Sequence, residues 1–303
     1  MSDRVFPNLF LVGVMKSGST TLHDEIGKHP EVFMTDFKEP QYFANPANAN
    51  LMWFDGKPPP DSDGRWYRAL FDEARKDERI KFAGESSMDY TQRPIIEGCA
   101  GRIHAYNPDS RILCILRDPV DRCISHYWHN VQIECETRSM RKALRLDVRY
   151  VAFSDYALQL KPYFDLFPRD NIHIVTLESF SADRQRELRS IFEWLGVEET
   201  FVIPEGRRQN VTPQKIYSAR RGMKWLARLP ATRRWRKMTR PLPGKFHSTV
   251  HKLSYRPVVR TTTDYAECVD YLRPILSEKL EVFCKLLGRE FPEWETTLAR
   301  GGS

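Results

Sequence analysis

A loop near the start of the chain carries the residue types that bind a phosphate-like anion. Gly13-Val-Met-Lys-Ser-Gly-Ser-Thr-Thr21 places two glycines five positions apart, one lysine between them and three hydroxyls after the second glycine. Glycines let backbone N–H groups point into one concavity, and a helix that starts there adds partial positive charge. An ordinary strand-to-helix turn needs neither the lysine nor the hydroxyls. The loop therefore predicts a site for a tetrahedral oxyanion.

This loop differs from the nucleoside-triphosphate pattern G-x-x-x-x-G-K-[ST] in the place of its lysine. The spacing of the glycines agrees, but Ser19 follows Gly18 and the lysine is Lys16. A nucleotide kinase or NTPase needs its lysine on the β- and γ-phosphates, and a magnesium-binding serine supported by an aspartate. A P-loop kinase or NTPase is therefore a rival interpretation that the lysine disfavours, and magnesium-dependent ATP turnover would distinguish it.

A second anion site is predicted about a hundred positions later. Arg117 ends an apolar run, and Ser125 lies about two turns into the helix that follows it. An arginine fork and a hydroxyl together can bind a phosphate monoester. The alternative is that Arg117 only pairs with Asp118 or Asp121 at the surface. Two separated anion sites favour a ligand with two phosphate-like groups.

The apolar pattern predicts the elements that position these loops. Predicted strands are Pro7–Val14, Ile80–Ala83, Arg111–Leu116 and Ile172–Leu177, and predicted helices are Thr21–Lys28, Pro94–Tyr106, a helix from Pro119, Asp155–Leu166, Ser181–Leu195, Gln214–Leu229 and Asp264–Leu287. Alternating strands and helices indicate an α/β fold, with a central parallel sheet flanked by helices. Ligands of such sheets bind at the carboxyl ends of the strands, so we expect chemistry in the loops after Val14, Ala83 and Leu116.

The composition predicts a folded single domain over residues 1–303. Hydrophobic residues make up 41% and charged residues 29% of the chain. The longest apolar stretch, Leu9–Met15, is far shorter than the roughly 20 residues of a membrane-crossing helix. The amino terminus lacks a long apolar segment with a cleavage site, so we expect a cytoplasmic protein. Six scattered cysteines predict neither a disulfide scaffold nor a metal site.

The charge is distributed unevenly. Residues 207–260 contain 16 lysines and arginines and no aspartate or glutamate, whereas the rest of the chain carries 31 basic and 40 acidic residues. We expect this segment to face an anion, and its resemblance to the corresponding region of nucleotide-dependent transferases implies helices and a loop near the nucleotide or acceptor site, with one of its arginines over the nucleotide. A solvated basic face and peripheral membrane contact are alternatives. A noncatalytic binder of nucleic acid or anionic membrane is the second rival interpretation.

Both anion motifs resemble those of sulfotransferases that use 3′-phosphoadenosine 5′-phosphosulfate (PAPS). The first loop is similar to their G-x-x-K-x-G-T-T-x-L pattern, although Ser19 intervenes, and Arg117–Tyr127 is similar to R-D-P-x-x-R-x-x-S-x-Y. The resemblance implies a P-loop-type three-layer fold and release of 3′-phosphoadenosine 5′-phosphate (PAP) without a metal. Lys16 would neutralise charge as PAP leaves, and Arg122 would be structural. The expected PAPS ligands are Lys16, Ser17, Gly18, Ser19, Thr20, Thr21, Arg117 and Ser125.

The segment Lys38-Glu-Pro-Gln-Tyr-Phe43 resembles the K-E-P-x-Y/F-F segment of the same family. Its carboxylate acts as the base in the heparan-type carbohydrate sulfotransferases, which implies that Glu39 deprotonates an acceptor hydroxyl. Aryl and steroid sulfotransferases use histidine instead, so His23 and His104 are alternatives. The acceptor is left open between a carbohydrate, a glycolipid and a small metabolite, and no nucleic-acid partner is expected.

Phe82-Ala-Gly-Glu-Ser-Ser-Met-Asp-Tyr90 resembles the family segment G-E-K-S-P-x-Y, with Ser86 where lysine is frequent. This departure argues against a second catalytic lysine from that loop. Glu85 and Ser87 either line the acceptor cleft or only pack beneath it. Leu286–Trp294 resembles the family's terminal helix and tryptophan, and we expect it to pack in the core.

Overall fold

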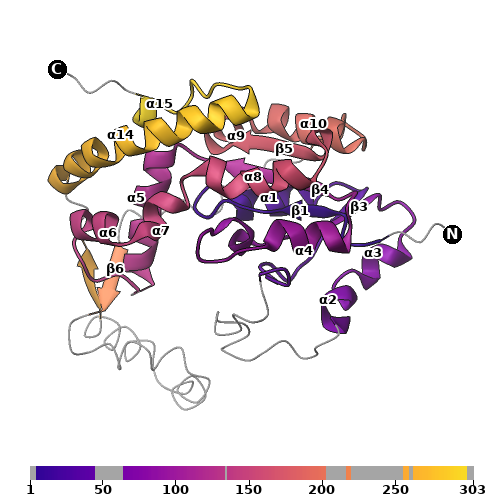
Figure 1. The fold of residues 1–303 in the computed structure, drawn as a ribbon. Coiled ribbons are helices and arrows are strands. Elements are labelled where there is room, and N and C mark those ends of the chain that lie inside the picture. The colour runs from indigo at the N-terminus through magenta and orange to yellow at the C-terminus, as the bar shows by residue number, and fades with distance from the viewer. Residues whose placement is uncertain are drawn as a thin grey trace, which may run out of the picture.

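A five-stranded parallel sheet is the centre of the protein (Figure 1). The structure is a computed structural model that describes residues 5–44, 64–133, 135–202, 216–219, 255–258 and 262–298. The strands lie in the order β2-β3-β1-β4-β5. They are β1 (Leu9–Leu11), β2 (Val32–Met34), β3 (Phe82–Ser86), β4 (Arg111–Leu116) and β5 (Ile172–Thr176). The predicted α/β fold with a central parallel sheet is confirmed.

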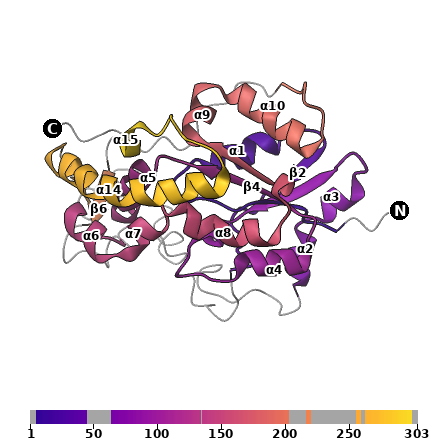
Figure 2. The same cartoon turned by 45° about the horizontal axis from the view of Figure 1, so that its top comes forward.

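Helices cover both faces of this sheet. They are α1 (Ser19–Ile26), α2 (Arg65–Ala69), α3 (Asp72–Lys76), α4 (Cys99–Tyr106), α5 (Pro119–Gln132), α6 (Met140–Leu146), α7 (Val148–Ala152), α8 (Tyr156–Leu166), α9 (Leu177–Ala182), α10 (Arg184–Leu195), α14 (Thr262–Leu287) and α15 (Glu295–Leu298), with 3-10 turns η3 (Met88–Thr91) and η4 (Arg169–Asn171). Figure 2 shows α1, α9 and α10 on one face, and α4 and α8 on the other.

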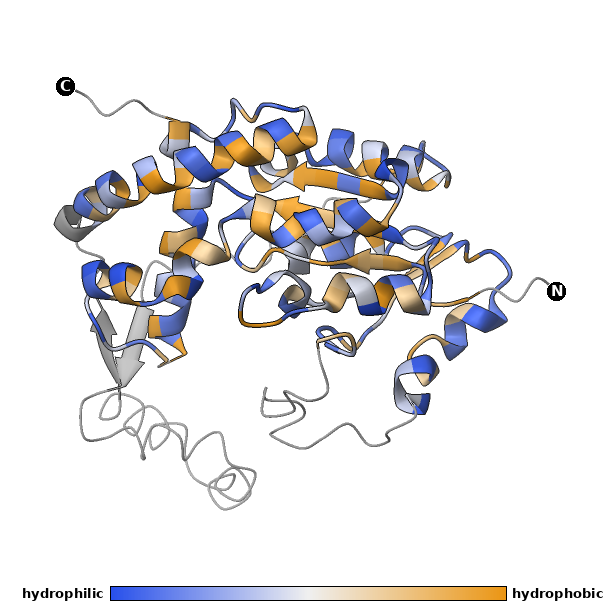
Figure 3. Ribbon diagram, in the orientation of Figure 1, coloured by the Kyte–Doolittle hydropathy of each residue, from blue (hydrophilic) through white to orange (hydrophobic). Residues whose placement is uncertain are grey.

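The two faces are built by alternation along the strands. In β4, Ile112 and Cys114 pack with residues of α4 and α8, whereas Leu113 and Ile115 pack with α1 and α10. Successive strand residues point to opposite faces, so a strand that is buried on both faces must be apolar at every position. Figure 3 shows the sheet as mostly hydrophobic ribbon. This is why β4 was predicted with its observed bounds.

Several predicted elements differ from the observed ones. Strand β3 runs to Ser86 rather than Ala83, because it buries the polar Glu85 and Ser86. The predicted helix Ser181–Leu195 is two helices, since Asp183 ends α9 and its side chain caps α10. The short edge strand β2 was missed. Helix α14 runs through Pro274 to Leu287, where the predicted helix Asp264–Leu287 also ends.

The acid-free segment lies largely outside the described residues. Its described parts are β6 (Ile216–Ala219) and β7 (Tyr255–Val258), which pair antiparallel. The predicted helix Gln214–Leu229 is therefore wrong at Ile216–Ala219, where backbone pairing with β7 overrides the helical spacing of apolar residues. The other predictions for 207–260 fall on residues that are not described.

The carboxyl-terminal part packs as expected. Phe291 and Trp294 are buried, and their rings stack with centroids 4.1 Å apart. This confirms that the Leu286–Trp294 segment contributes to the core. Within the described ranges, no helix has the length and apolar composition needed to cross a membrane.

Candidate active site

Three loops meet at the carboxyl edge of the sheet. Because β1 is paired in parallel with β3 and with β4, Leu11 lies beside Ser86 on one side and Leu113 on the other. The pairing with β4 continues beyond the end of β1, since Val14 N–H donates to the Ile115 carbonyl over 2.9 Å. The loops after Val14, Ser86 and Leu116 therefore leave the sheet side by side, as the sequence predicted for this edge.

The first loop has the backbone of an anion cradle. Lys16 and Gly18 have positive φ values of 69° and 90°. The positive φ of Gly18 favours glycine there, and a Cβ would lie 2.9 Å from Leu177 Cδ1, so the end of that side chain would have to shift. Gly18 is the N-cap of α1 and no side chain caps the helix, which leaves its first N–H groups for a ligand.

The third loop brings a second cation to this cradle. Arg117 Nη1 donates to the Lys16 carbonyl over 3.3 Å. Burial lowers the pKa of Lys16, and the neighbouring Arg117 charge lowers it further. In the described part of the chain, neither side chain forms an ion pair with a carboxylate. Two adjacent cations without a close counterion favour a bound anion. We call Gly13–Thr21 together with Arg117 and Ser125 the anion cradle.

Two hydroxyls of the anion cradle are buried and unsatisfied. Ser17 Oγ and Ser125 Oγ have no hydrogen-bond partner among the described residues. Because a buried hydroxyl without a partner costs free energy, such groups in a native fold need an explanation. Bound phosphate oxygens would supply the partners, so the geometry fits a ligand that has anionic groups at both positions.

Helix α5 is held in place by residues that do not face the ligand. Asp118 caps the helix by accepting from Val120 N–H over 3.0 Å, and it also accepts from the Thr297 hydroxyl over 2.7 Å. The buried Arg122 donates to Ser154 Oγ over 2.5 Å and to the Tyr150 carbonyl over 2.6 Å. The sequence prediction of a structural Arg122 agrees with these contacts.

Glu39 lies on the segment after β2 and is tied to the loop after β3. Its N–H donates to the Ser86 carbonyl over 3.0 Å, and its Oε2 accepts from Met88 N–H over 2.8 Å. Its Oε1 is buried without a hydrogen bond and lies 3.8 Å from Lys38 Nζ. Burial raises the pKa of Glu39 to about 7. A carboxylate with a pKa near 7 and a free oxygen is suited to accept a proton.

A fully buried carboxyl supports this segment, which we call the base loop (Lys38–Phe43). Glu85 accepts from Tyr67 over 3.0 Å, from Tyr90 over 2.6 Å and from Ser87 Oγ over 2.7 Å. Burial raises the pKa of Glu85 to about 7. Of the two interpretations left open for Glu85 and Ser87, the structure supports packing beneath the site, because both side chains are fully buried.

The same groups reach the backbone of the base loop. Ser87 Oγ accepts from Gln41 N–H over 2.9 Å, and the Tyr90 hydroxyl accepts from Phe43 N–H over 3.2 Å. Glu39 and Gln41 both have left-handed φ values, 59° and 55°, which side chains other than glycine rarely adopt. The hydrogen bonds from Ser87 and Tyr90 therefore hold a loop conformation that local preferences disfavour.

The two alternative histidines differ in their position relative to the site. Both ring nitrogens of the buried His23 are engaged, Nε2 with the Thr35 carbonyl over 3.1 Å and Nδ1 with Ser86 Oγ over 2.9 Å. The carbonyl requires a proton on Nε2, so Nδ1 accepts from the serine. His104 packs against Phe167, 5.2 Å between centroids, near the amino ends of β4 and β5. His23 thus lies beside the carboxyl edge with both ring nitrogens engaged, whereas His104 lies away from that edge.

Lys38 is the group whose importance the sequence analysis missed. It was quoted in the Lys38–Phe43 motif without a role. In the structure its Nζ donates to Thr20 Oγ1 in the anion cradle, and it is the nearest cation to Glu39 Oε1 among the described residues. The signal that the sequence offered was that Lys38 directly precedes Glu39.

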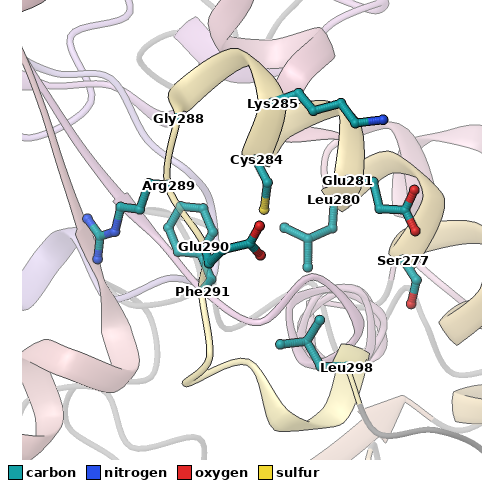
Figure 4. Close-up of a pocket in the computed structure, with 10 residues that line it drawn as sticks. All are labelled: Ser277, Leu280, Glu281, Cys284, Lys285, Gly288, Arg289, Glu290, Phe291 and Leu298. Atoms are coloured by element: carbon teal, nitrogen blue, oxygen red, sulfur yellow. The ribbon is translucent and has the colours of Figure 1, made fainter.

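A separate cavity lies away from these loops (Figure 4). Its volume is about 410 Å³, and it is formed by α14, α15 and the segment between them. Leu280, Phe291 and Leu298 line it together with the oppositely charged Glu281 and Lys285. It contains none of the predicted site residues and does not concentrate positive charge, so it is not the anion site.

Comparison with known proteins places this site in a family. Residues 7–201 match the sulfotransferase family. Heparan sulfate glucosamine 3-O-sulfotransferase 3B1 of Mus musculus is 27% identical over 205 residues, which are 64% of this chain and 47% of that protein. Membrane-associated sulfotransferase kil1 of Dictyostelium discoideum is 31% identical over 126 residues, 42% of this chain and 23% of that protein. The chain thus spans about half the length of the mouse protein and about a quarter of the Dictyostelium protein.

The fold comparison agrees. A sulfotransferase from Alicyclobacillus acidocaldarius superposes with a TM-score of 0.65 and 23% identity, over 95% of this chain and 98% of that one. The P-loop-type three-layer architecture expected from the motifs is confirmed by this likeness. The matched residues 7–201 contain the anion cradle, the base loop and Glu85. This chain belongs to the sulfotransferase family.

Proposed function

We propose that this protein transfers a sulfuryl group from PAPS to a hydroxyl of a carbohydrate acceptor. The proposal depends on the neighbouring cations Lys16 and Arg117, together with two buried hydroxyls of the anion cradle that have no described partner, Ser17 and Ser125. One anion site lies at the amino end of α1 and the other beside α5, which suits the two phosphate positions of an adenosine bisphosphate. Family membership supports the choice of a sulfuryl donor over a nucleoside triphosphate.

The residues divide the chemistry between donor and acceptor. Backbone N–H groups of Gly18 to Thr21 bind the 5′-phosphate, and Arg117 with Ser125 binds the 3′-phosphate. Bound PAPS supplies an activated sulfuryl group whose sulfur an acceptor oxygen attacks in line. Glu39 accepts the hydroxyl proton at Oε1, and Lys16 stabilises the negative charge that develops on the departing phosphate oxygen.

The names of the relatives support a carbohydrate acceptor. The mouse protein is named as a heparan sulfate glucosamine 3-O-sulfotransferase, and another relative is human carbohydrate sulfotransferase 15. A carboxylate base at Glu39, rather than His23 or His104, supports a carbohydrate-type site by the resemblance of the base loop. Glycolipids and small metabolites are then alternative outcomes of the acceptor test.

The test combines a binding and a transfer measurement. We expect PAP to bind the full chain in calorimetry, and sulfur-35 from labelled PAPS to appear on heparan sulfate. Absence of a PAP complex, together with no transfer to any acceptor in a fractionated carbohydrate, glycolipid and metabolite extract, would overturn the proposal. PAP binding with label only on a noncarbohydrate fraction would overturn the acceptor class and leave the donor assignment in place.

A further inference from the structure

Lys38 lies where the donor and base halves of the site meet. Its Nζ donates to Thr20 Oγ1, the second residue of α1, and lies 3.8 Å from Glu39 Oε1. Its side chain is only 21% exposed, so the ammonium is held between these groups rather than extended into solvent. An ammonium has three N–H donors, and the hydrogen bond to Thr20 uses one of them, which leaves donors for a further oxygen.

The loop after β3 does not supply a cation at this place. Ser86, at the end of β3, directs its Oγ to His23 Nδ1 over 2.9 Å. The neighbouring side chains Glu85 and Ser87 are buried and bond to each other over 2.7 Å. Lys16 and Arg117 belong to the anion cradle, and Lys38 is the one described cation that forms an ion pair with Glu39. Lys38 is therefore the described cation beside the base.

We propose that Lys38 is a catalytic residue that contacts the transferring sulfuryl group and keeps Glu39 ionised as the base. This inference rests on the proposed function and assigns a role to a residue that the motif alone left without one. The sulfuryl group keeps three oxygens throughout the transfer, and a fixed cation beside them stabilises the negative charge that they carry.

The transfer exchanges one bond to sulfur for another. The acceptor oxygen forms a bond to sulfur while the bond between sulfur and the bridging oxygen of the 5′-phosphate breaks. The bond's electron pair passes to that phosphate oxygen, whose charge Lys16 stabilises. The acceptor proton passes to Glu39, and Lys38 contacts a sulfuryl oxygen without changing its own protonation.

Lys38 also sets the charge of the base. Around Glu39, Lys38 favours the carboxylate, whereas Asp89 and Glu85 in the loop and strand beside it act in the opposite sense. The charged or titratable groups around Lys38 and Glu39 are Asp89, Glu85, His23 and Asp24. Removing the ammonium leaves two acidic neighbours and no described cation beside Glu39, so its pKa must rise.

The experiment compares Lys38→Met with Lys38→Arg, using labelled PAPS and whichever acceptor the wild type sulfates. For Lys38→Met we expect kcat to fall roughly 100-fold, as when one charge-stabilising donor is removed. The acid limb of the kcat/KM profile should move to higher pH. Lys38→Arg keeps the positive charge, so its acid limb should remain close to that of the wild type, with part of the lost kcat restored.

Two controls separate catalysis from folding and from donor binding. Lys161→Met removes an exposed lysine paired with Asp165 on α8 and should change neither kcat nor the pH profile. PAP lacks the sulfuryl group, so Lys38→Met should weaken PAP binding far less than it lowers kcat. A wild type that transfers sulfate beside a Lys38→Met variant with unchanged kcat and pH profile would refute this role without affecting the proposed function. A loss confined to PAP affinity would likewise refute it.

Discussion

The anion cradle and the base loop use similar buried polar residues in opposite ways. In the cradle, Ser17 and Ser125 keep buried hydroxyls without partners among the described residues. Beneath the base loop, Glu85 accepts three hydrogen bonds within the protein, and Ser87 is bonded at its oxygen. The first region leaves its polar atoms for a ligand, whereas the second uses them to fix its own backbone.

This difference separates binding groups from positioning groups. Unsatisfied buried polar atoms cost free energy that a ligand can recover, so their loss should be seen in affinity. A satisfied buried network rigidifies what it supports, so its loss should be seen in stability and turnover. Glu39 combines both features, since Oε2 is bonded to Met88 N–H and Oε1 is free of hydrogen bonds.

The largest effect is expected at Glu39. Glu39→Gln keeps the shape and the bond to Met88 but cannot take a proton, so turnover should fall roughly 100-fold or more. Because the pKa of Glu39 is raised to about 7, wild-type kcat/KM should increase as pH rises through that value, and the variant should lose this limb. Kinetics across pH with labelled PAPS measure both. Unchanged turnover would mean that another group is the base.

PAP affinity in Glu39→Gln is the matched control for that experiment. The carboxyl lies on the base loop and not in the anion cradle, so calorimetry should give nearly the wild-type dissociation constant. A large loss of PAP affinity would show that Glu39 also takes part in donor binding, so the anion cradle and the base loop would not have separate functions.

The next effect tests the cradle. Arg117→Ala removes a charged donor, and PAP affinity should fall roughly 30-fold, from an interaction of about 2 kcal/mol. Ser125→Ala should cost about 1 kcal/mol, or roughly fivefold. Calorimetry with PAP measures both losses.

Adenosine 5′-phosphate, which lacks the 3′-phosphate, provides the control ligand. Its affinity should be almost insensitive to Ser125→Ala and less sensitive than that of PAP to Arg117→Ala. Equal losses for the two nucleotides would show that this helix does not bind the 3′-phosphate.

A smaller effect is expected at Glu85, in the free energy of unfolding. Glu85→Gln places an amide opposite three hydroxyl donors, which should lower stability by roughly 1–3 kcal/mol. The folded-state pKa of Glu85 is about 7, above its ordinary value of 4.5, so its contribution declines as pH rises from about 4.5 to 7. The variant should lose this part of the pH dependence.

Urea unfolding at about pH 5 and about pH 8 measures this change. Glu39 and Asp89 also have raised pKa values, about 7 and about 6, so a residual slope of the same sign should remain in Glu85→Gln. Glu97→Gln, at a half-exposed carboxyl paired with Arg93, is the control and should keep the full slope. A full slope in Glu85→Gln would show that Glu85 is ionised throughout.

The smallest effect is expected at His104. Its ring packs on Phe167 near the amino ends of β4 and β5, whereas the base loop lies at the carboxyl edge of the sheet. His104→Gln should leave kcat and PAP affinity within about twofold of the wild type, as for surface substitutions away from a site. A loss comparable to that of Glu39→Gln would restore the histidine alternative.

Much of the fold and of the anion cradle could be predicted from the sequence, because their signals are local. An apolar run buried on both faces defines β4, and glycines at 13 and 18 are needed for the backbone of one loop. Lys16, Arg117 and Ser125 were identified because each follows a predicted strand at a short distance. Parallel strands end at one edge, so even the proximity of the two loops followed from topology.

Only the tertiary structure decided the contacts of Lys38, Glu85 and the histidines. Whether Glu85 lines or supports the site depends on Tyr67 and Tyr90, which approach it from other segments. Both ring nitrogens of His23 are bonded, one to Thr35 and one to Ser86, and the Lys38 ammonium donates to Thr20. The sequence by itself determined which loop has the residues and backbone of an anion cradle, since these depend on neighbouring residues. Burial, pKa and hydrogen-bond partners depend on contacts between distant segments, so only the packed structure decides them.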